Sequence, residues 1–314
     1  MTGSYEDDAP TLTTTLKNQG FTQSSNGWVC YLPIPWNAAL GTETIDVQVG
    51  RYSTTLYLKV TDGGFSYKDY SSQSQRATPY LGQDDAPTKV SKLFTAAPTG
   101  ISWADAGFVQ PFLNRLNTTL TFGATEYVGR RYSERSTNTG AGGRTSTNVI
   151  LSTTRGELVI APASGKINLA EDLGGDYGIT LVIDHGAGVR TIFYGLSDID
   201  IKAGQQVKQG QTLATCGKTT VVEMRIGTIP IDPIAVWRGQ RTGTATGEEA
   251  VFWAVHPVQP DLSCDPAGRV VLAPLTMADD LWFFYKAKKG EFRHGRRSGQ
   301  SSLWFYRIQL SSKE

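Results

Sequence analysis

Residues 161–237 contain the run that decides the fold: APASGKI at 161–167, GGDYG at 174–178, ITLVIDHG at 179–186, RTIFYGLS at 190–197, IKAGQQVKQGQTLA at 201–214 and IDP at 231–233. The apolar runs are short, rich in β-branched and aromatic residues, and bounded by glycine and aspartate, which is typical of strands joined by turns. Gly204 and Gly210 bracket a polar segment as in a tight hairpin, because glycine tolerates a positive φ. This stretch predicts a compact β-structure.

In this order and spacing, the segments resemble the lysostaphin-type (LytM-like) zinc metallopeptidases, which cut peptide cross-links in bacterial cell walls. The resemblance covers roughly a quarter of the chain. It implies a mainly β fold: a central LytM-like β-sandwich or barrel-sandwich domain with additional β segments on both sides and few short helices.

The resemblance also locates the positions at which such an enzyme holds its zinc. The family takes its ligands from a His-x-x-x-Asp motif and from the second His of a His-x-His motif, and two further His residues assist catalysis. In this chain Ser146 and Ile150 stand at the first motif, Gly195 replaces the His of a Tyr-Ala-His-Leu-Ser segment, and Thr219 and Val221 stand at the His-x-His positions. None of these side chains binds zinc as the chemistry needs. We therefore expect no metal, no other cofactor and no catalytic residue here.

A count of ligand residues gives the same expectation without an alignment. The chain has only three histidines, His185, His256 and His294, and no aspartate lies between Val109 and Glu171. The first ligand pair is therefore missing from its required place, and without zinc no water is activated near neutral pH. The sequence predicts that the chain is not an enzyme. We expect His185, in its Ile-Asp-His-Gly turn, to be structural.

A chain of 314 residues is long enough for two or three domains. We predict a β-rich N-terminal region with an extended arm at 1–95, a degenerate LytM-like domain at 96–238 with its core at 156–237, and a β-rich C-terminal region at 239–314. Alternating apolar residues predict a hairpin that turns around residues 50–53, and residues 66–90 read as a long loop. The best helix candidate is Ala104 to Leu116.

The charge, the hydropathy and the cysteine content limit the kinds of partner and the cellular compartment that we expect. The net charge is +1, which does not support bulk attraction to nucleic acid. No apolar run is long enough to insert into a membrane, and the acidic, polar start does not resemble a signal peptide. Cys30, Cys216 and Cys264 are an odd, widely spaced set, for which one disulfide or three free thiols both remain open, the latter being commoner in a reducing cytosol.

These observations favour a non-catalytic structural or assembly protein of a phage particle, in the tail or baseplate, made in the host cytoplasm and located in the virion. Its expected partners are other virion subunits, a homo-oligomer being one arrangement, with weak contact to peptidoglycan. The alternative is a degenerate LytM-like regulator or cell-wall-binding module that acts on a hydrolase partner. A third reading, a hydrolase with a different site, stays open because sequence alone does not exclude a pair of carboxylates.

Overall fold

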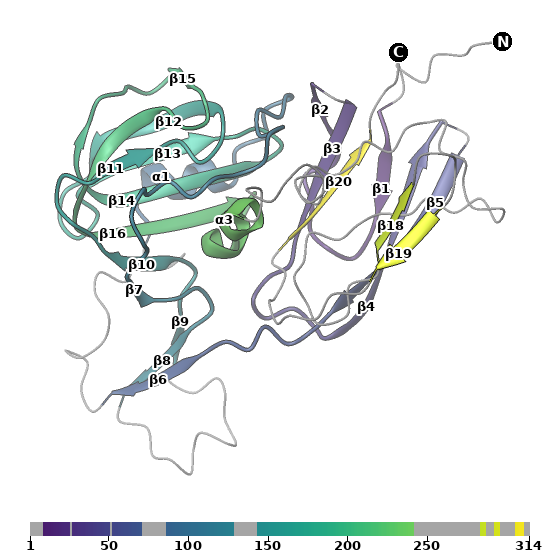
Figure 1. Cartoon of the computed structure of the whole chain (residues 1–314), viewed down its shortest axis with the longest axis horizontal. Coiled ribbons are helices and arrows are strands. Elements are labelled where there is room, and N and C mark those ends of the chain that lie inside the picture. The colour runs from purple at the N-terminus through teal and green to yellow at the C-terminus, as the bar shows by residue number, and fades with distance from the viewer. Residues whose placement is uncertain are drawn as a thin grey trace.

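The computed structural model describes residues 9–25, 27–50, 52–70, 86–128, 143–241, 283–286, 292–295 and 305–310. Most of the described secondary structure is β, as predicted, and the described helices are α1 (Thr88–Phe94) and α3 (Pro233–Arg241). Neither helix is long and apolar enough to cross a membrane. Figure 1 shows the sheets as two lobes with a smaller β-structure extending below one of them.

The larger lobe is built on a nine-stranded sheet that contains the run quoted from the sequence. Its path is β15-β12-β13-β14-β16-β10-β7, and β11 and β17 also pair with β16, all antiparallel. The bounds are β7 (Thr118–Leu120), β10 (Val149–Ser152), β11 (Leu158–Ile160), β12 (Gly165–Asp172), β13 (Ile179–Asp184), β14 (Val189–Ile199), β15 (Gln206–Val207), β16 (Thr212–Ile226) and β17 (Ile229–Ile231). Strand β16 pairs with four neighbours, so it organises the sheet.

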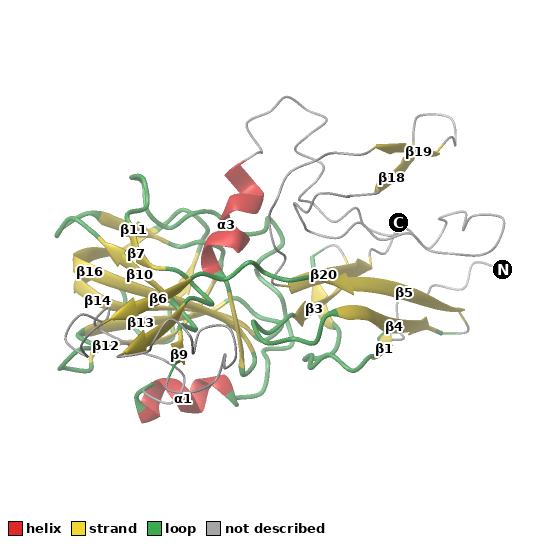
Figure 2. Cartoon of the chain, turned by 90° about the horizontal axis from the view of Figure 1, so that it is seen from below, coloured by secondary structure: helices red, strands yellow, loops and turns green. Residues whose placement is uncertain are grey.

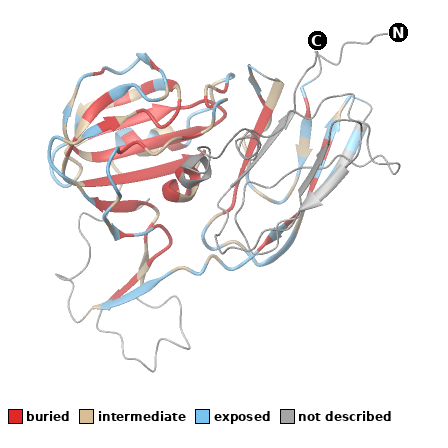
Figure 3. Cartoon of the chain, viewed as in Figure 1, coloured by how far each residue is buried: buried red, intermediate tan, exposed pale blue. Residues whose placement is uncertain are grey.

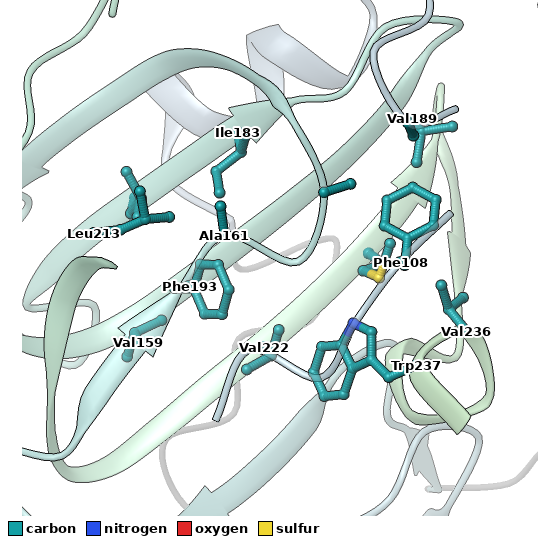
Figure 4. Close-up of a cluster of buried hydrophobic side chains, with 14 of the residues drawn as sticks. Phe108, Val159, Ala161, Ile183, Val189, Phe193, Leu213, Val222, Val236 and Trp237 are labelled. Carbon is teal, nitrogen blue, oxygen red and sulfur yellow. The ribbon is translucent and has the colours of Figure 1, made fainter. Parts of the chain in front are cut away.

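The two faces of this sheet bury different side chains because residues alternate across a strand. Along β16, Val222, Met224 and Ile226 enter the main core. Helix α3 covers part of that core, and the ring of Trp237 meets Phe112 edge to face at 6.2 Å. Figure 4 shows this cluster, and Figure 3 shows the buried strands that enclose it. Val221 belongs to a second cluster on the opposite face.

The second lobe shares one strand with the first. In β3 (Gly27–Pro33), Val29 and Tyr31 belong to the main core, whereas Cys30 and Leu32 belong to a separate cluster. That separate cluster also contains residues of β4 (Gly41–Val49) and β5 (Tyr52–Val60). These two strands pair as the predicted hairpin. The lobes are therefore joined by apolar contact through β3.

Strands from both ends of the chain meet in this lobe. Strand β3 pairs with β2 (Thr22–Ser24) on one side and β20 (Phe305–Leu310) on the other, and β1 (Thr11–Thr13) pairs with β4. Strands β18 (Phe283–Lys286) and β19 (Phe292–Gly295) form a hairpin of their own. The predicted boundaries at 95 and 238 stay predictions, and residues 242–282, with His256 and Cys264, lie outside the described residues.

Two local predictions were wrong. Ala104 to Leu116 is not a helix, because its backbone pairs with another segment: the Val109 amide donates to Pro162 O (2.8 Å) and the Ile160 amide to Pro111 O (2.9 Å). Pro111 also lacks the N–H that a helix interior needs. Residues 66–90 are not one loop, because they include β6 (Tyr67–Tyr70) and the start of α1.

The small projecting sheet connects the two lobes along the chain. It has the order β6-β8-β9, with β8 (Thr125–Val128) and β9 (Arg144–Thr145), and β6 runs parallel to β8. Within it the buried carboxylate of Glu126 pairs with Arg144 at 2.9 Å. The view from below in Figure 2 places α1 beside the large sheet, on the side away from α3.

Candidate functional site

The candidate site is the face of the large sheet that looks away from the main core. Backbone pairing sets its residues side by side in rows across β13, β14, β16 and β10. One row is Tyr194, Val221 and Ile150; the next is Val182, Ile192 and Glu223; the third is Asp184, Arg190 and Arg225. We call this surface the covered face, because its residues are buried. It changes from apolar at one end to charged at the other.

Two of the sequence-predicted zinc positions lie together at the apolar end. Ile150 and Val221 are directly paired between β10 and β16, and both are fully buried. Tyr194 lies beside Val221 on β14 and is also fully buried. The topology therefore brings these two positions into contact, but with hydrocarbon side chains where the family has an aspartate and a histidine.

Ser146 and Thr219 take other roles. Ser146 is buried, and its hydroxyl donates to the carbonyl oxygen of Asn148 at 2.7 Å. It thereby stabilises the turn that leads into β10. Thr219 is half-buried and lies opposite Ser152, two residues from Val221 and on the same face of β16.

Gly195 is fixed by the backbone around it. Its φ is +71°, in the left-handed region, and a Cβ at this position would lie 2.5 Å from the carbonyl oxygen of Thr219. Gly217 meets the same constraint, because its Cβ would lie 2.4 Å from the carbonyl oxygen of Gly195. The pairing of β14 with β16 shifts register between Tyr194 and Leu196, where Gly195 lies, and again between Leu196 and Asp198. The backbone has therefore closed over the place where the family's histidine side chain begins.

Helix α1 supplies the cover. Val90 and Phe94, its two buried residues, belong to the same apolar cluster as Ile150 and Val221. At the outer edge of the helix, the ammonium group of Lys89 pairs with Glu171 at 2.8 Å, both side chains being exposed. A shift of the apolar pattern by one residue would break this packing, because Val90 and Phe94 share one face of the helix only at the spacing i, i+4.

The segment after α1 continues over the charged end. The guanidinium of Arg225 lies over the ring of Phe94, 4.0 Å from its centre. Arg190 donates to the carbonyl oxygen of Ala96 at 3.4 Å, and the Thr99 hydroxyl donates to Asp184 at 3.0 Å. Residues 88–99 thus contact the covered face from its apolar row to its charged row.

The charged row is balanced within the protein. Arg225 forms an ion pair with Glu223, and its Nη1 donates to the carbonyl oxygen of Thr228 at 2.7 Å. Arg190 pairs more loosely with Asp184, at 3.8 Å. Arg190 and Arg225 face each other across β14 and β16, so the two carboxylates offset repulsion between two buried cations. Sequence reasoning missed this group because its members are scattered over three strands.

Burial shifts the pKa values of the ionisable groups here. It raises the pKa of Glu223, partly offset by Arg225, and it raises the pKa of Tyr194 well above the usual value, with the nearby Glu223 carboxylate adding to the rise. It lowers the pKa of Arg190. The pKa of His185 falls to about 4, again mainly through burial.

His185 has the structural place that the sequence predicts. It is fully buried, Nδ1 lies 2.9 Å from the carbonyl oxygen of Ser164, and Nε2 lies 2.9 Å from the hydroxyl of Thr191. A carbonyl only accepts, so Nδ1 carries the proton and Nε2 accepts from Thr191. The ring also meets Phe108 edge to face at 5.2 Å. The histidine therefore ties three segments together.

The covered face does not fit a zinc ion at the family's positions. Zinc needs nitrogen, sulfur or carboxylate ligands in a nearly tetrahedral set, and Ile150, Val221 and Gly195 offer none. Within the part of the chain that the structure describes, no three His, Cys, Asp or Glu side chains come together to hold a metal ion. Cys30 and Cys216 are buried free thiols in separate clusters. Burial raises their pKa values to about 12 and about 11.

Comparison with known proteins identifies the domain. Residues 144–233 match the sequence model of Peptidase family M23. The chain therefore carries an M23, or LytM-like, domain, and the resemblance seen in the sequence is confirmed at that level. An uncharacterized metalloprotease of Haemophilus influenzae is 31% identical over 112 residues, which are 33% of this chain and 24% of the relative. The match thus spans about a quarter of the relative's length.

Solved structures with a similar fold include several peptidases. An M23-type protein from Pseudomonas aeruginosa has a TM-score of 0.45 at 18% identity and covers 74% of this chain and 89% of its own. A zinc-containing peptidase from Vibrio cholerae scores 0.32 at 17% identity, covering 65% and 54%. The catalytic domain of lysostaphin from Staphylococcus simulans scores 0.31 at 21% identity, covering 39% and 92%.

One prediction from the sequence is contradicted by these comparisons. The chain was expected not to be an enzyme, yet residues 144–233 match a peptidase family, and 112 residues of the chain match a relative described as a metalloprotease. The expectation was inferred for the whole protein from the residue types at only five positions. Those positions define one zinc site, whereas the family match covers a whole domain.

Proposed function

We propose that the chain is a structural and assembly component of a phage particle, in the tail or baseplate, in which the M23-like domain serves as a framework for subunit contacts. One observation carries the proposal: the face that bears the family's motif positions is filled by the chain's own helix α1, with Val90 and Phe94 packed against Ile150 and Val221. A sheet face that is covered in this way forms part of the hydrophobic core between the helix and the sheet.

The arrangement of the second lobe supports the same role. Strand β3 contributes to both cores and pairs with β20 from the end of the chain. An M23-like domain tied into such a framework suits a particle that must meet a bacterial cell wall. The proposed partners are other virion subunits or further copies of this chain, with weak contact to peptidoglycan.

Mass spectrometry of purified particles tests this proposal. The chain is expected at a fixed copy number in particles from cells that carry its gene, and particles from cells that lack the gene should be incomplete in the tail or baseplate. Complete, infectious particles without the polypeptide would contradict the proposal.

A second candidate, peptidase activity of the M23-like domain, is favoured by the family match. A zymogram of the purified full chain on peptidoglycan tests it, and a clearing band at the size of the chain supports it. A pull-down with cell-wall amidases separates both candidates from a degenerate regulator of a hydrolase partner, because only such a regulator would be retained by the amidases without producing a clearing band.

A further inference from the structure

We infer that helix α1, and not a bound metal ion, closes and stabilises the covered face of the sheet. In a zinc peptidase of this family, residues on β10 and β16 meet at the metal. Here the corresponding residues Ile150 and Val221 meet through direct strand pairing and through a shared apolar cluster with Val90 and Phe94. The metal centre of the family is thereby replaced by a hydrophobic contact between a helix and the sheet.

The side chains around Ile150 and Val221 are consistent with the replacement of a metal centre by a hydrophobic contact. Hydrocarbon side chains at 150 and 221 stabilise the folded protein only when water is removed from them. Both are fully buried, and Val90 and Phe94 of α1 belong to the cluster that excludes the water. The ring of Phe94 extends the cover to the charged row, where it lies against Arg225. One aromatic residue therefore contacts both ends of the covered face.

The backbone supports the same conclusion at Gly195. The carbonyl oxygens of Thr219 and Gly195 occupy the positions into which side chains at 195 and 217 would project. A ligand side chain at 195 would have to push β14 away from β16. The strands have thus closed upon each other where an open metal site would need space.

The experiment measures thermal unfolding and amide hydrogen exchange of the full chain with EDTA, with added Zn²⁺ and with neither. Phe94→Ala is expected to lower Tm by about 10 °C and to raise exchange in β10 and β16 at least about tenfold. Lys92→Ala, on the exposed side of the same helix, is the matched control, with a shift within about 2 °C.

Two further variants keep the result specific. Leu58→Ala, in the separate cluster of the second lobe, is expected to raise exchange in β4 and β5 and to leave β10 and β16 protected. If Phe94→Ala does not fold, Phe94→Leu retains most of the apolar volume and is expected to lower Tm by a smaller amount.

Chelation of metal ions shows whether helix α1 or a bound metal ion closes the covered face. Neither EDTA nor Zn²⁺ is expected to move Tm by more than about 1 °C or to change exchange in β10 and β16. A chelator-induced loss of protection in those two strands would overturn the inference. So would a Phe94→Ala protein with the Tm and the exchange pattern of the unaltered chain.

Discussion

At the scale of single residues, the covered face shows how a few side chains change what a sheet can hold. Ile150 and Val221 occupy paired positions on β10 and β16 and are fully buried. Glycine at 195 allows the backbone of β14 to approach that of β16 so closely that a Cβ atom would have no room between them. Each feature favours close apolar packing, and each predicts a measurable cost when it is reversed.

Restoring the family's residue type at position 150 should destabilise the protein. Ile150→Asp places a carboxylate in an apolar cluster, so we expect a loss of about 3 kcal/mol or more at pH 7. Burial raises the pKa of the new carboxyl in the folded state, so the penalty should grow as pH rises above about 4. Urea unfolding at pH 4 and pH 7 measures it. Ile150→Val, the control, should cost about 1 kcal/mol at both values, and an equal cost for both variants would contradict the prediction.

Gly195→Ala should cost more than its backbone angle alone explains. The new Cβ would meet the carbonyl oxygen of Thr219, so we expect a loss of about 3 kcal/mol in chemical denaturation. Gly174→Ala is the matched control: its φ of +70° is nearly the same, and nothing lies within 4 Å of its Cβ. That control should lose only about 1 kcal/mol. Similar losses at the two positions would show that close approach is not the cause.

His185 should make stability fall in mildly acidic solution. Its pKa is about 4 in the folded protein and near 6.5 when unfolded. The unfolded chain therefore binds the proton first, and the contribution is complete above about pH 6.5 and is lost as pH falls towards 4. We expect the free energy of unfolding to drop by ~1 kcal/mol or more between pH 6.5 and pH 5. His185→Gln should lack that slope, and a variant with an unchanged slope would contradict the assignment.

At the scale of elements, α1 shows that apolar contacts outweigh its surface ion pair. The pair between Lys89 and Glu171 is exposed, and such pairs contribute little. Lys89→Ala should therefore change the free energy of unfolding by less than about 0.5 kcal/mol. Urea unfolding at low and high salt checks this, and a loss above about 1 kcal/mol would show that the ion pair anchors the helix.

At the scale of the whole molecule, the lobes depend on contacts between distant parts of the chain. Strand β20 pairs with β3 over six residues, from Phe305 opposite Pro33 to Leu310 opposite Trp28. Removing 305–314 leaves β3 with an open edge, so we expect faster amide exchange in β3 and a tendency to self-associate. Removing only 311–314, the control, keeps that pairing intact. Unchanged exchange in β3 after the longer truncation would contradict the prediction.

The sequence by itself determined the β-architecture of the central domain, and it predicted which residues stand at the family's zinc positions. Both depend on local signals: short β-branched runs between glycines, and the spacing of motifs such as Phe193 to Ser197. The hairpin of β4 and β5 was predictable for the same reason, since Ile45 and Val47 alternate with polar residues. The function of the whole protein was not predictable in this way, and the prediction that it is not an enzyme was wrong.

Only the tertiary structure decided that α1 covers the face on which those positions lie. Val90, Leu93 and Phe94 give a weak signal in the sequence, because three apolar residues in a seven-residue segment define neither a helix nor its partner. The row of Asp184, Arg190 and Arg225 forms only when three strands pair in register. Contacts between residues far apart in the chain depend on the packing of the whole sheet, and no local pattern of residue types encodes them.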